Sequence, residues 1–239
     1  MIESAVLIGN DKLTREQLAL VPTPSGTATH RPIPHIEVVN ALIETIGFRH
    51  ISVVNDEYAV SRDGMKMFGV IELDQGMHGA RFALGLRNSH DKSFRLAITV
   101  GYRVFVCENL AFSGDFSPVL AKHSKNFSLQ NALSIGVDGM QRNFKPMVEA
   151  VDRWRDSQLS DTAARLVIYR AFVEGELEVP RHLARMVHSS YFKPEHEEFT
   201  SRTMWSLSNA FTSSFKELDP IPKYRATGKL AGFLQTTIG

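Results

Sequence analysis

Four segments of alternating apolar and polar residues, separated by short turns, constrain the fold of this chain most strongly. They cover residues 50–61, 65–73, 80–89 and 94–109, and the turns between them contain Asp-Gly, Gln-Gly and His-Asp-Lys-Ser sequences. Runs with this period of two predict β-strands. Connections this short predict antiparallel neighbours, because parallel strands need crossovers of a dozen or more residues. The sequence therefore predicts an antiparallel β-meander of about four strands.

The last of these segments separates its residues clearly between two faces. One face collects apolar side chains: Phe94, Leu96, Ile98, Val100, Tyr102, Val104 and Val106. The other face carries Arg95, Thr99, Gly101 and Arg103. Since successive side chains of a strand point to opposite faces, we expect one face of the sheet to be buried and the other to expose the arginines.

Helical spacing appears on both sides of the strand region. Residues 34–47 place apolar side chains on one face, with Pro34 suited to the first turn and Gly47 to the stop. Residues 128–158 predict one long helix that packs on the sheet, with Ser128 as N-cap and Pro146 as a point of kinking or division. Further helical segments follow, the first ending at Gly175, while the tail from residue 223 has no clear assignment.

These elements predict a single α+β domain. We expect an N-terminal arm over residues 1–33, a core of helix, antiparallel sheet and long helix over 34–158, and a helical region over 159–239 packed on that core. A chain of 239 residues with 43% hydrophobic residues is long and apolar enough to form such a core.

Several classes of protein are disfavoured by the sequence. No apolar run approaches the roughly 20 residues that cross a bilayer, and the first residues lack the pattern of a signal peptide, so we expect a cytoplasmic protein without a membrane partner. A single cysteine, Cys107, excludes an internal disulfide. The Gly-rich fingerprints of nucleotide-binding loops are absent. His188, Glu195, His196, Glu197 and Glu198 lie close together in the sequence but lack a metal-ligand spacing. We therefore expect no cofactor and no metal.

Positive charge is concentrated in the middle of the chain. Residues 81–145 hold nine Lys and Arg against four Asp and Glu, whereas residues 1–80 hold six against ten. A row of cations and amide donors suits the phosphate backbone of a nucleic acid. The candidate nucleic-acid-binding residues are Arg87, Asn88, Lys92, Arg95, Arg103, Asn109, Lys122 and Lys125. The bases could stack on Phe105, Phe112 or Phe116. The alternative to a nucleic-acid-binding surface is a sheet face whose charges only keep the protein soluble.

Two nucleophilic candidates also occur in this region. Ser89, His90 and Asp91 are consecutive, but adjacent residues point in different directions and a catalytic triad depends on geometry. Cys107 ends an apolar strand, where a buried, inert thiol is the more common outcome. We therefore expect a binding protein rather than an enzyme, and assign no catalytic residue.

The runs RNSHDKS and GYRVFVCENLAF, together with the later MWSLSNAFTSSFKE, resemble a family described as phage/plasmid-like proteins, a domain of unknown function. The resemblance extends from about Pro34 to Leu218. The order of helix, antiparallel meander and long helix is also similar to the core of the single-strand annealing superfamily, which includes the phage Red-beta and Erf recombinases. This second resemblance implies a homo-oligomer that binds single-stranded DNA in a basic groove and pairs strands without ATP.

The expected function is thus ATP-independent binding of single-stranded DNA, with strand annealing in phage or plasmid recombination. Two alternatives from other classes stay open. One is an interaction protein that binds a host component, for example of a defence system. The other is a nuclease or nucleotide-cleaving enzyme that uses the cluster from Asn88 to Lys92.

Overall fold

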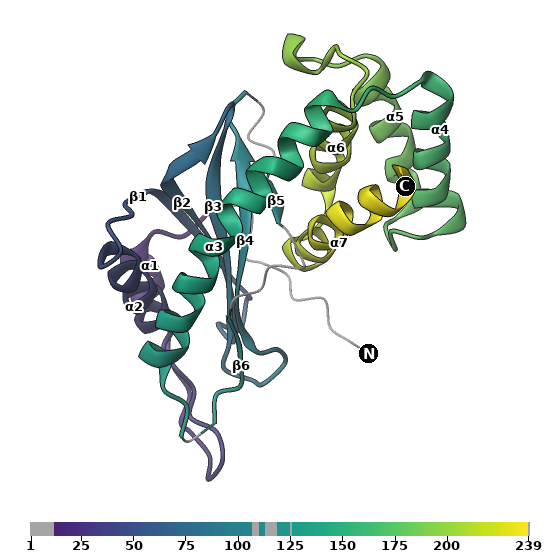
Figure 1. Ribbon diagram of the computed structural model, residues 1–239. Coiled ribbons are helices and arrows are strands. Elements are labelled where there is room, and N and C mark those ends of the chain that lie inside the picture. Colours follow the sequence, from purple (N-terminus) through teal and green to yellow (C-terminus); the bar gives the residue numbers. More distant parts are fainter. Residues whose placement is uncertain (1–11, 107–109, 113–118, 125, 239) are drawn as a thin grey trace. The chain divides into compact units, whose positions relative to one another are not determined.

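The computed structural model describes residues 12–106, 110–112, 119–124 and 126–238 (Figure 1). The chain forms two compact units. Unit 1 comprises residues 1–76, 81–102 and 116–142. Unit 2 comprises residues 77–80, 103–115 and 143–239. The boundary passes through the sheet and through the longest helix, so both units take part of their structure from the same continuous elements.

The predicted antiparallel meander is confirmed. Its strands are β1 (Val53–Val60), β2 (Lys66–Met77), β3 (Ala80–Ser89) and β4 (Leu96–Val104), and they pair in chain order. Two short strands, β5 (Leu110–Phe112) and β6 (Val119–Ala121), also pair with β4. The tight turns before β2 and β3 contain Gly64 and Gly79 at φ of +71° and +73°, a backbone conformation that glycine adopts without steric cost.

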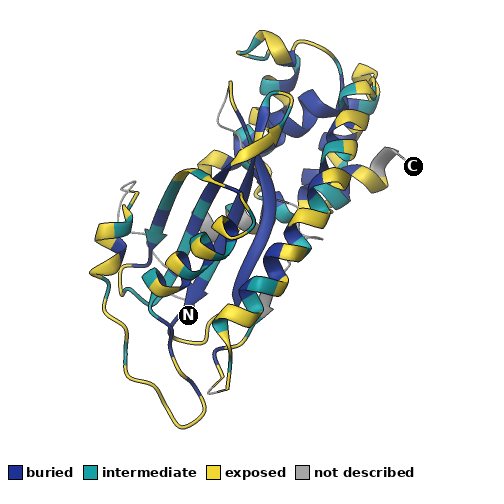
Figure 2. Ribbon diagram, turned by 60° about the vertical axis from the view of Figure 1, so that its left-hand side comes forward, coloured by how far each residue is buried: buried dark blue, intermediate teal, exposed yellow. Residues whose placement is uncertain are grey.

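Both faces of the central strands are buried, which corrects the prediction of one solvent-exposed face. Every residue of β4 from Leu96 to Tyr102 is buried (Figure 2). On the side predicted to be exposed, Ala97 and Thr99 are each 1% exposed. Their small side chains allow close approach of covering residues, so this face presents no continuous cationic surface.

The helices of unit 1 begin with α1 (Arg15–Ala19) and α2 (His35–Gly47). The long helix α3 (Leu129–Asp156) starts in unit 1, where it crosses one face of the sheet (Figure 1). Ser128 accepts a hydrogen bond from the Asn131 amide at 3.4 Å, as expected of an N-cap. Pro146 lies inside α3, which continues through it as one helix.

Unit 2 is largely helical. Helix α4 (Asp161–Tyr169) continues into a π-helical turn (Arg170–Glu174) that ends at Gly175, the predicted stop, at φ of +78°. Helices α5 (Ala184–Phe192), α6 (Met204–Ser214) and α7 (Pro220–Ile238) follow, and α7 contains the tail that the sequence left unassigned. Ten of the eleven residues of α6 are buried, so α6 forms the core of this unit. No helix in the described residues is long and apolar enough to cross a membrane.

Candidate nucleic-acid interface

Three of the predicted cationic residues lie at one end of the sheet. Lys92 and Arg95 belong to the turn between β3 and β4, and both are exposed. Strand β4 pairs with β6 in a register that places Leu96 opposite Ala121. The next residues outward from that pair are Arg95 and Lys122, so these two cations lie at the same end of the paired strands.

Backbone contacts bring two further segments to this end. The amide of Arg31 donates to the carbonyl of His123 at 3.3 Å, which places Arg31 beside the residues that follow β6. The amide of His90 donates to the carbonyl of Met65 at 2.8 Å, which joins the β3–β4 turn to the β1–β2 turn. That second turn carries another cation, Arg62, and Lys66 follows it as the first residue of β2.

We call the resulting group the cationic end. In the described residues of its four segments, six cationic side chains stand against two carboxylates, Asp63 and Asp91. The cations are Arg31, Arg62, Lys66, Lys92, Arg95 and Lys122, of which only Lys66 is not classed as exposed. Excess positive charge on exposed side chains suits a polyanion, because each phosphate contact releases condensed counterions.

The two carboxylates of the cationic end are already engaged. The hydrogen bond from Ser61 Oγ, at 2.5 Å, lowers the pKa of Asp63, which also accepts from the Met65 amide. For Asp91, burial acts to raise the pKa, but hydrogen bonds from Ser93 bring it below its ordinary value. Both groups are therefore ionised at neutral pH and hold turns in place, and Asp91 lies 3.6 Å from Lys66 Nζ.

The remaining predicted residues are not part of the cationic end. Asn88 is fully buried, and its Nδ2 donates to the Ile33 carbonyl at 3.1 Å. Arg87 is half-buried, with its guanidinium 5.6 Å from the centre of the Phe94 ring. Arg103 is also half-buried and belongs to unit 2. Asn109 and Lys125 lie outside the described residues.

Two half-buried aromatic rings flank the exposed cations. Phe94 precedes Arg95 and packs against Phe68, with ring centres 5.3 Å apart. Phe127 stacks on His123 at 6.2 Å between centres. Of the aromatics proposed from the sequence, Phe105 is 53% exposed but belongs to unit 2. The side chains of Phe112 and Phe116 are not among those described.

Behind the cationic end lies a group of buried histidines that the sequence reasoning largely missed: His30, His35, His90 and His123. Their exposed fractions are between 1% and 8%. Burial lowers the pKa of His35 and of His123 from 6.5 to about 4, and it also lowers the pKa of His90. These four residues are scattered over more than 90 positions, so no spacing motif marks them.

The geometry of this group supports neither a metal site nor a catalytic one. In the described part of the chain, no group of three or more His, Cys, Asp and Glu side chains is placed to hold a metal ion. His90, the histidine of the nuclease alternative, is 3% exposed, and its Nε2 donates to the Ile33 carbonyl at 3.0 Å. A substrate approaching from solvent would not reach this ring as it is placed here.

Comparison with models of known protein families shows to which family the chain belongs. A family model described as Domain of unknown function (DUF932) matches residues 26–230. The chain belongs to the DUF932 family. Searches of curated proteins and of solved structures found no match.

The DUF932 match contains the whole cationic end and all four buried histidines. It begins at Gly26, in the segment that carries His30 and Arg31, and it ends within α7. The surface described above is thus formed entirely by residues of the DUF932 domain.

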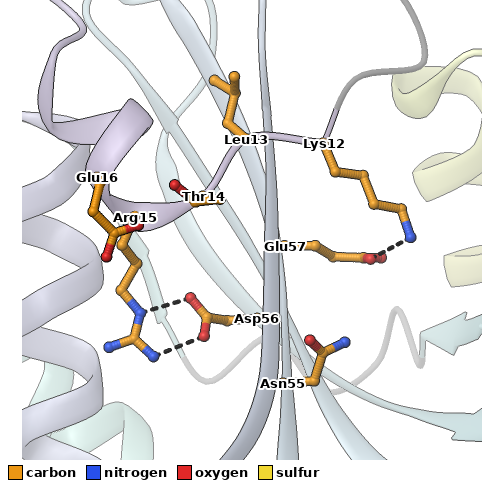
Figure 3. Close-up of a pocket in the computed structure, with 8 residues that line it drawn as sticks. All are labelled: Lys12, Leu13, Thr14, Arg15, Glu16, Asn55, Asp56 and Glu57. Atoms are coloured by element: carbon orange, nitrogen blue, oxygen red, sulfur yellow. Dashed lines mark hydrogen bonds and ion pairs between the residues drawn. The ribbon is translucent and has the colours of Figure 1, made fainter.

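A hollow of about 540 Å³ lies between the start of α1 and strand β1 (Figure 3). Five of its eight lining residues, Lys12 to Glu16, precede the DUF932 match. Four of its five charged side chains form ion pairs: Lys12 Nζ lies 2.5 Å from Glu57, and Arg15 makes two bonds of 2.7 Å to Asp56. The Arg15 guanidinium lowers the pKa of Asp56. Because the lining holds three carboxylates and two cations, this hollow does not suit a polyanion.

Proposed function

We propose that this DUF932 domain binds single-stranded DNA without ATP, through the cationic end of unit 1. The observation that carries the proposal is the convergence of four separate segments on one end of the sheet, with five exposed cations among them. The two carboxylates there are held in turns, so they do not move to neutralise those cations.

The preference for single strands is supported by the neighbouring aromatic rings. Phe94 and Phe127 are half-buried and stand next to the cations. Unstacked bases bind aromatic side chains by stacking, at about 1–3 kcal/mol per base. Paired bases inside a duplex do not offer their faces in this way. A surface that joins exposed cations to accessible rings therefore favours a single strand over a duplex.

The order of elements adds a second line of support. Helix α2, the meander β1–β4 and helix α3 follow the order found in the single-strand annealing superfamily. A fold can host many functions, so this similarity supports the proposal only together with the charged site. If the analogy extends to activity, the domain also pairs complementary strands and assembles with copies of itself, in phage or plasmid recombination.

The test is a titration of labelled single-stranded and double-stranded DNA at about 50 and 200 mM salt. With five phosphate contacts and a slope of about −0.7 per contact, affinity for a single strand should fall about 100-fold between these conditions. The triple variant Lys92→Glu, Arg95→Glu and Lys122→Glu should reduce that salt effect to about 7-fold, because about two contacts would remain.

A charge-matched control separates a local surface from general electrostatics. The variant Lys145→Glu, Arg181→Glu and Arg185→Glu changes the net charge equally, and all three residues are exposed on unit 2. Binding should be unchanged in this control and much weaker in the triple variant of the cationic end. Equal losses in the two variants would contradict the proposed surface, and no binding by the wild type at 50 mM salt would remove the function.

The aromatic contribution needs its own variant. Phe94→Leu keeps an apolar side chain against Phe68 but removes the flat ring. We expect affinity for single-stranded DNA to fall about 5- to 150-fold while duplex binding is unchanged, since stacking contributes about 1–3 kcal/mol. Equal effects on both DNA forms would show that Phe94 acts only by holding the turn.

A second candidate function, binding of a host protein, is favoured by an apolar stripe on unit 2. Leu166, Tyr169 and Val173 are 54%, 50% and 50% exposed and follow one another at helical spacing on α4 and the turn after it. Exposed apolar patches commonly mark interaction sites. Tyr169→Glu should abolish complex formation with a host protein while leaving DNA binding intact. If the complex with a host protein formed as well with Tyr169→Glu as with the wild type, this stripe would not be the interaction site, and the nucleic-acid function alone would be favoured.

A further inference from the structure

The buried histidines join three segments that are far apart in the sequence. These segments are residues 26–35, the β3–β4 turn and the residues after β6. His35 and His90 stack with ring centres 3.9 Å apart, and His30 lies parallel to His123 at 5.8 Å. Three of the four rings, those of His30, His35 and His90, also have hydrogen-bond partners. The chemistry of those partners fixes the protonation of His35 and sets a requirement on His30.

His35 is neutral in this arrangement, and burial favours the neutral form of His90 by lowering its pKa. The carbonyl of Ile33 can only accept, so Asn88 Nδ2, 3.1 Å away, is the donor, and the same nitrogen donates to His35 Nδ1 at 2.9 Å. His35 Nδ1 therefore carries a lone pair, while its Nε2 donates to the Gly64 carbonyl. Close stacking of the His90 ring on His35 disfavours charge on both rings at once.

His30 differs from both, because both of its ring nitrogens face carbonyl oxygens. Nδ1 lies 2.9 Å from the carbonyl of His123, and Nε2 lies 3.0 Å from the carbonyl of His90. A neutral imidazole has one N–H and one lone pair, and only the imidazolium donates from both nitrogens. We propose that His30 is a charged imidazolium that locks residues 26–34 onto the β3–β4 turn and the segment after β6, and that loss of its proton releases them.

The bonds around His30 show what the lock holds. The Thr27 amide donates to the His30 carbonyl at 2.8 Å, and the Arg31 amide donates to the His123 carbonyl. When the ring is neutral, one nitrogen presents a lone pair to a carbonyl oxygen about 3 Å away, so an attraction becomes a repulsion. The neutral ring thus favours separation of the segment 26–34 from both of its neighbours.

The surroundings of His30 contain few groups that compete for its charge. The β3–β4 turn contributes His90 and Asp91, and the carboxylate of Asp91 is paired with Lys66 of β2. The segment after β6 contributes His123, which is buried, and the exposed Lys122. The segment of His30 itself contributes the neutral His35 and the exposed Arg31. The two carbonyl oxygens are therefore the direct partners that the structure gives this ring.

Release of the lock would also change the cationic end, a consequence that rests on the proposed function. Arg31 is carried by the released segment, and Lys122 lies next to its docking position. Raising the pH should therefore lower the affinity for single-stranded DNA as the lock opens. His30 thus differs from the other three histidines: the folded arrangement favours its charged form, whereas it favours the neutral form of the other three.

The experiment is nitrogen NMR of protein labelled in its histidine rings, recorded from pH 5.5 to 8.5 together with amide hydrogen exchange. Both ring nitrogens of His30 should be protonated at pH 6, while His35 and His90 each show one protonated nitrogen. Protection of the Thr27 and Arg31 amides, corrected for the intrinsic pH dependence of exchange, should fall at least tenfold by pH 8.5. His30→Gln, which cannot donate in both directions, should show the low protection already at pH 6.

The outcomes keep the lock and the DNA function apart. A His30 ring with one protonated nitrogen at pH 6, or protection that is unchanged to pH 8.5, overturns the lock. Because these measurements use wild-type protein, they hold even if His30→Gln does not fold. The exposed His182, changed to Gln, is the control and should alter nothing. Absence of DNA binding at every pH, with the NMR result as expected, removes the proposed function and leaves the lock standing.

Discussion

Replacement of His123 by phenylalanine should remove a large part of the acid sensitivity of this protein. His123 is 6% exposed, and neither ring nitrogen has a hydrogen-bond partner among the described residues. Its ring stacks on Phe127 and lies parallel to His30. A phenyl ring can keep both contacts, while the buried titratable group disappears. At pH 7 we therefore expect stability equal to or above that of the wild type.

The magnitude follows from the shift of the pKa. Burial is the main cause that lowers the pKa of His123 from 6.5 to about 4, and the electrostatic influence of the nearby His30 and His90 rings adds less. The folded state thus favours the neutral ring, and its contribution to stability is fully present above pH 6.5 and is lost as pH falls toward 4. Between pH 7 and pH 5 the loss is about 2 kcal/mol for His123 and about the same for His35.

Urea unfolding at pH 7 and pH 5 measures this directly. The wild type should lose about 4 kcal/mol through His123 and His35 between the two conditions, and His123→Phe should lose about 2 kcal/mol less than the wild type. This range lies above the pKa values of the paired carboxylates, so histidines dominate the change. His182→Phe, at an exposed position, serves as the control. If His123→Phe keeps the full wild-type pH dependence, the reasoning from burial is refuted.

Three further variants test packing and backbone geometry. Gly69→Ala would place a Cβ 2.8 Å from the Tyr58 ring and should cost about 1–3 kcal/mol in urea unfolding, whereas Gly47→Ala meets nothing within 4 Å and should not destabilise. Pro146→Ala should raise stability by about 1–3 kcal/mol, because α3 gains an amide donor at an exposed helical position; an unchanged thermal midpoint would contradict this. Arg15→Ala removes the bidentate ion pair with Asp56. Because the Arg15 side chain is 40% exposed, the free energy of unfolding should fall by about 1 kcal/mol or less, and a fall above 2 kcal/mol would contradict a minor role for this pair.

Local patterns predicted the elements of this fold well. Alternation with short turns indicates an antiparallel meander regardless of the rest of the chain, and the structure has that meander. Ser128 caps the start of α3, and Gly175 ends the helical segment that begins with α4, both as predicted from the sequence. These signals depend on residues within a few positions of one another, and for that reason they can be read from the chain alone.

Burial and long-range contacts could not be read in the same way. An alternating strand tells which residues share a face, but it does not tell what covers each face, and Ala97 and Thr99 proved to be buried. The bond between His30 and the carbonyl of His123 joins positions 93 residues apart. Nothing near either residue indicates such a pairing. The histidine group therefore emerged only from the three-dimensional arrangement.

The position of the cations has a consequence for any test of binding by charge reversal. Turn residues point outside the sheet, so Arg95→Glu should change stability by no more than about 0.5 kcal/mol while it weakens binding of single-stranded DNA. Arg87 is half-buried over Phe94, and Arg87→Glu would put a carboxylate in its place, so a stability loss above 1 kcal/mol should accompany any loss of binding. Urea unfolding and DNA titration of both variants distinguish the two cases. If Arg87→Glu abolished binding with stability unchanged, the DNA would run over the face of the sheet, and the assignment of binding to its end would be wrong.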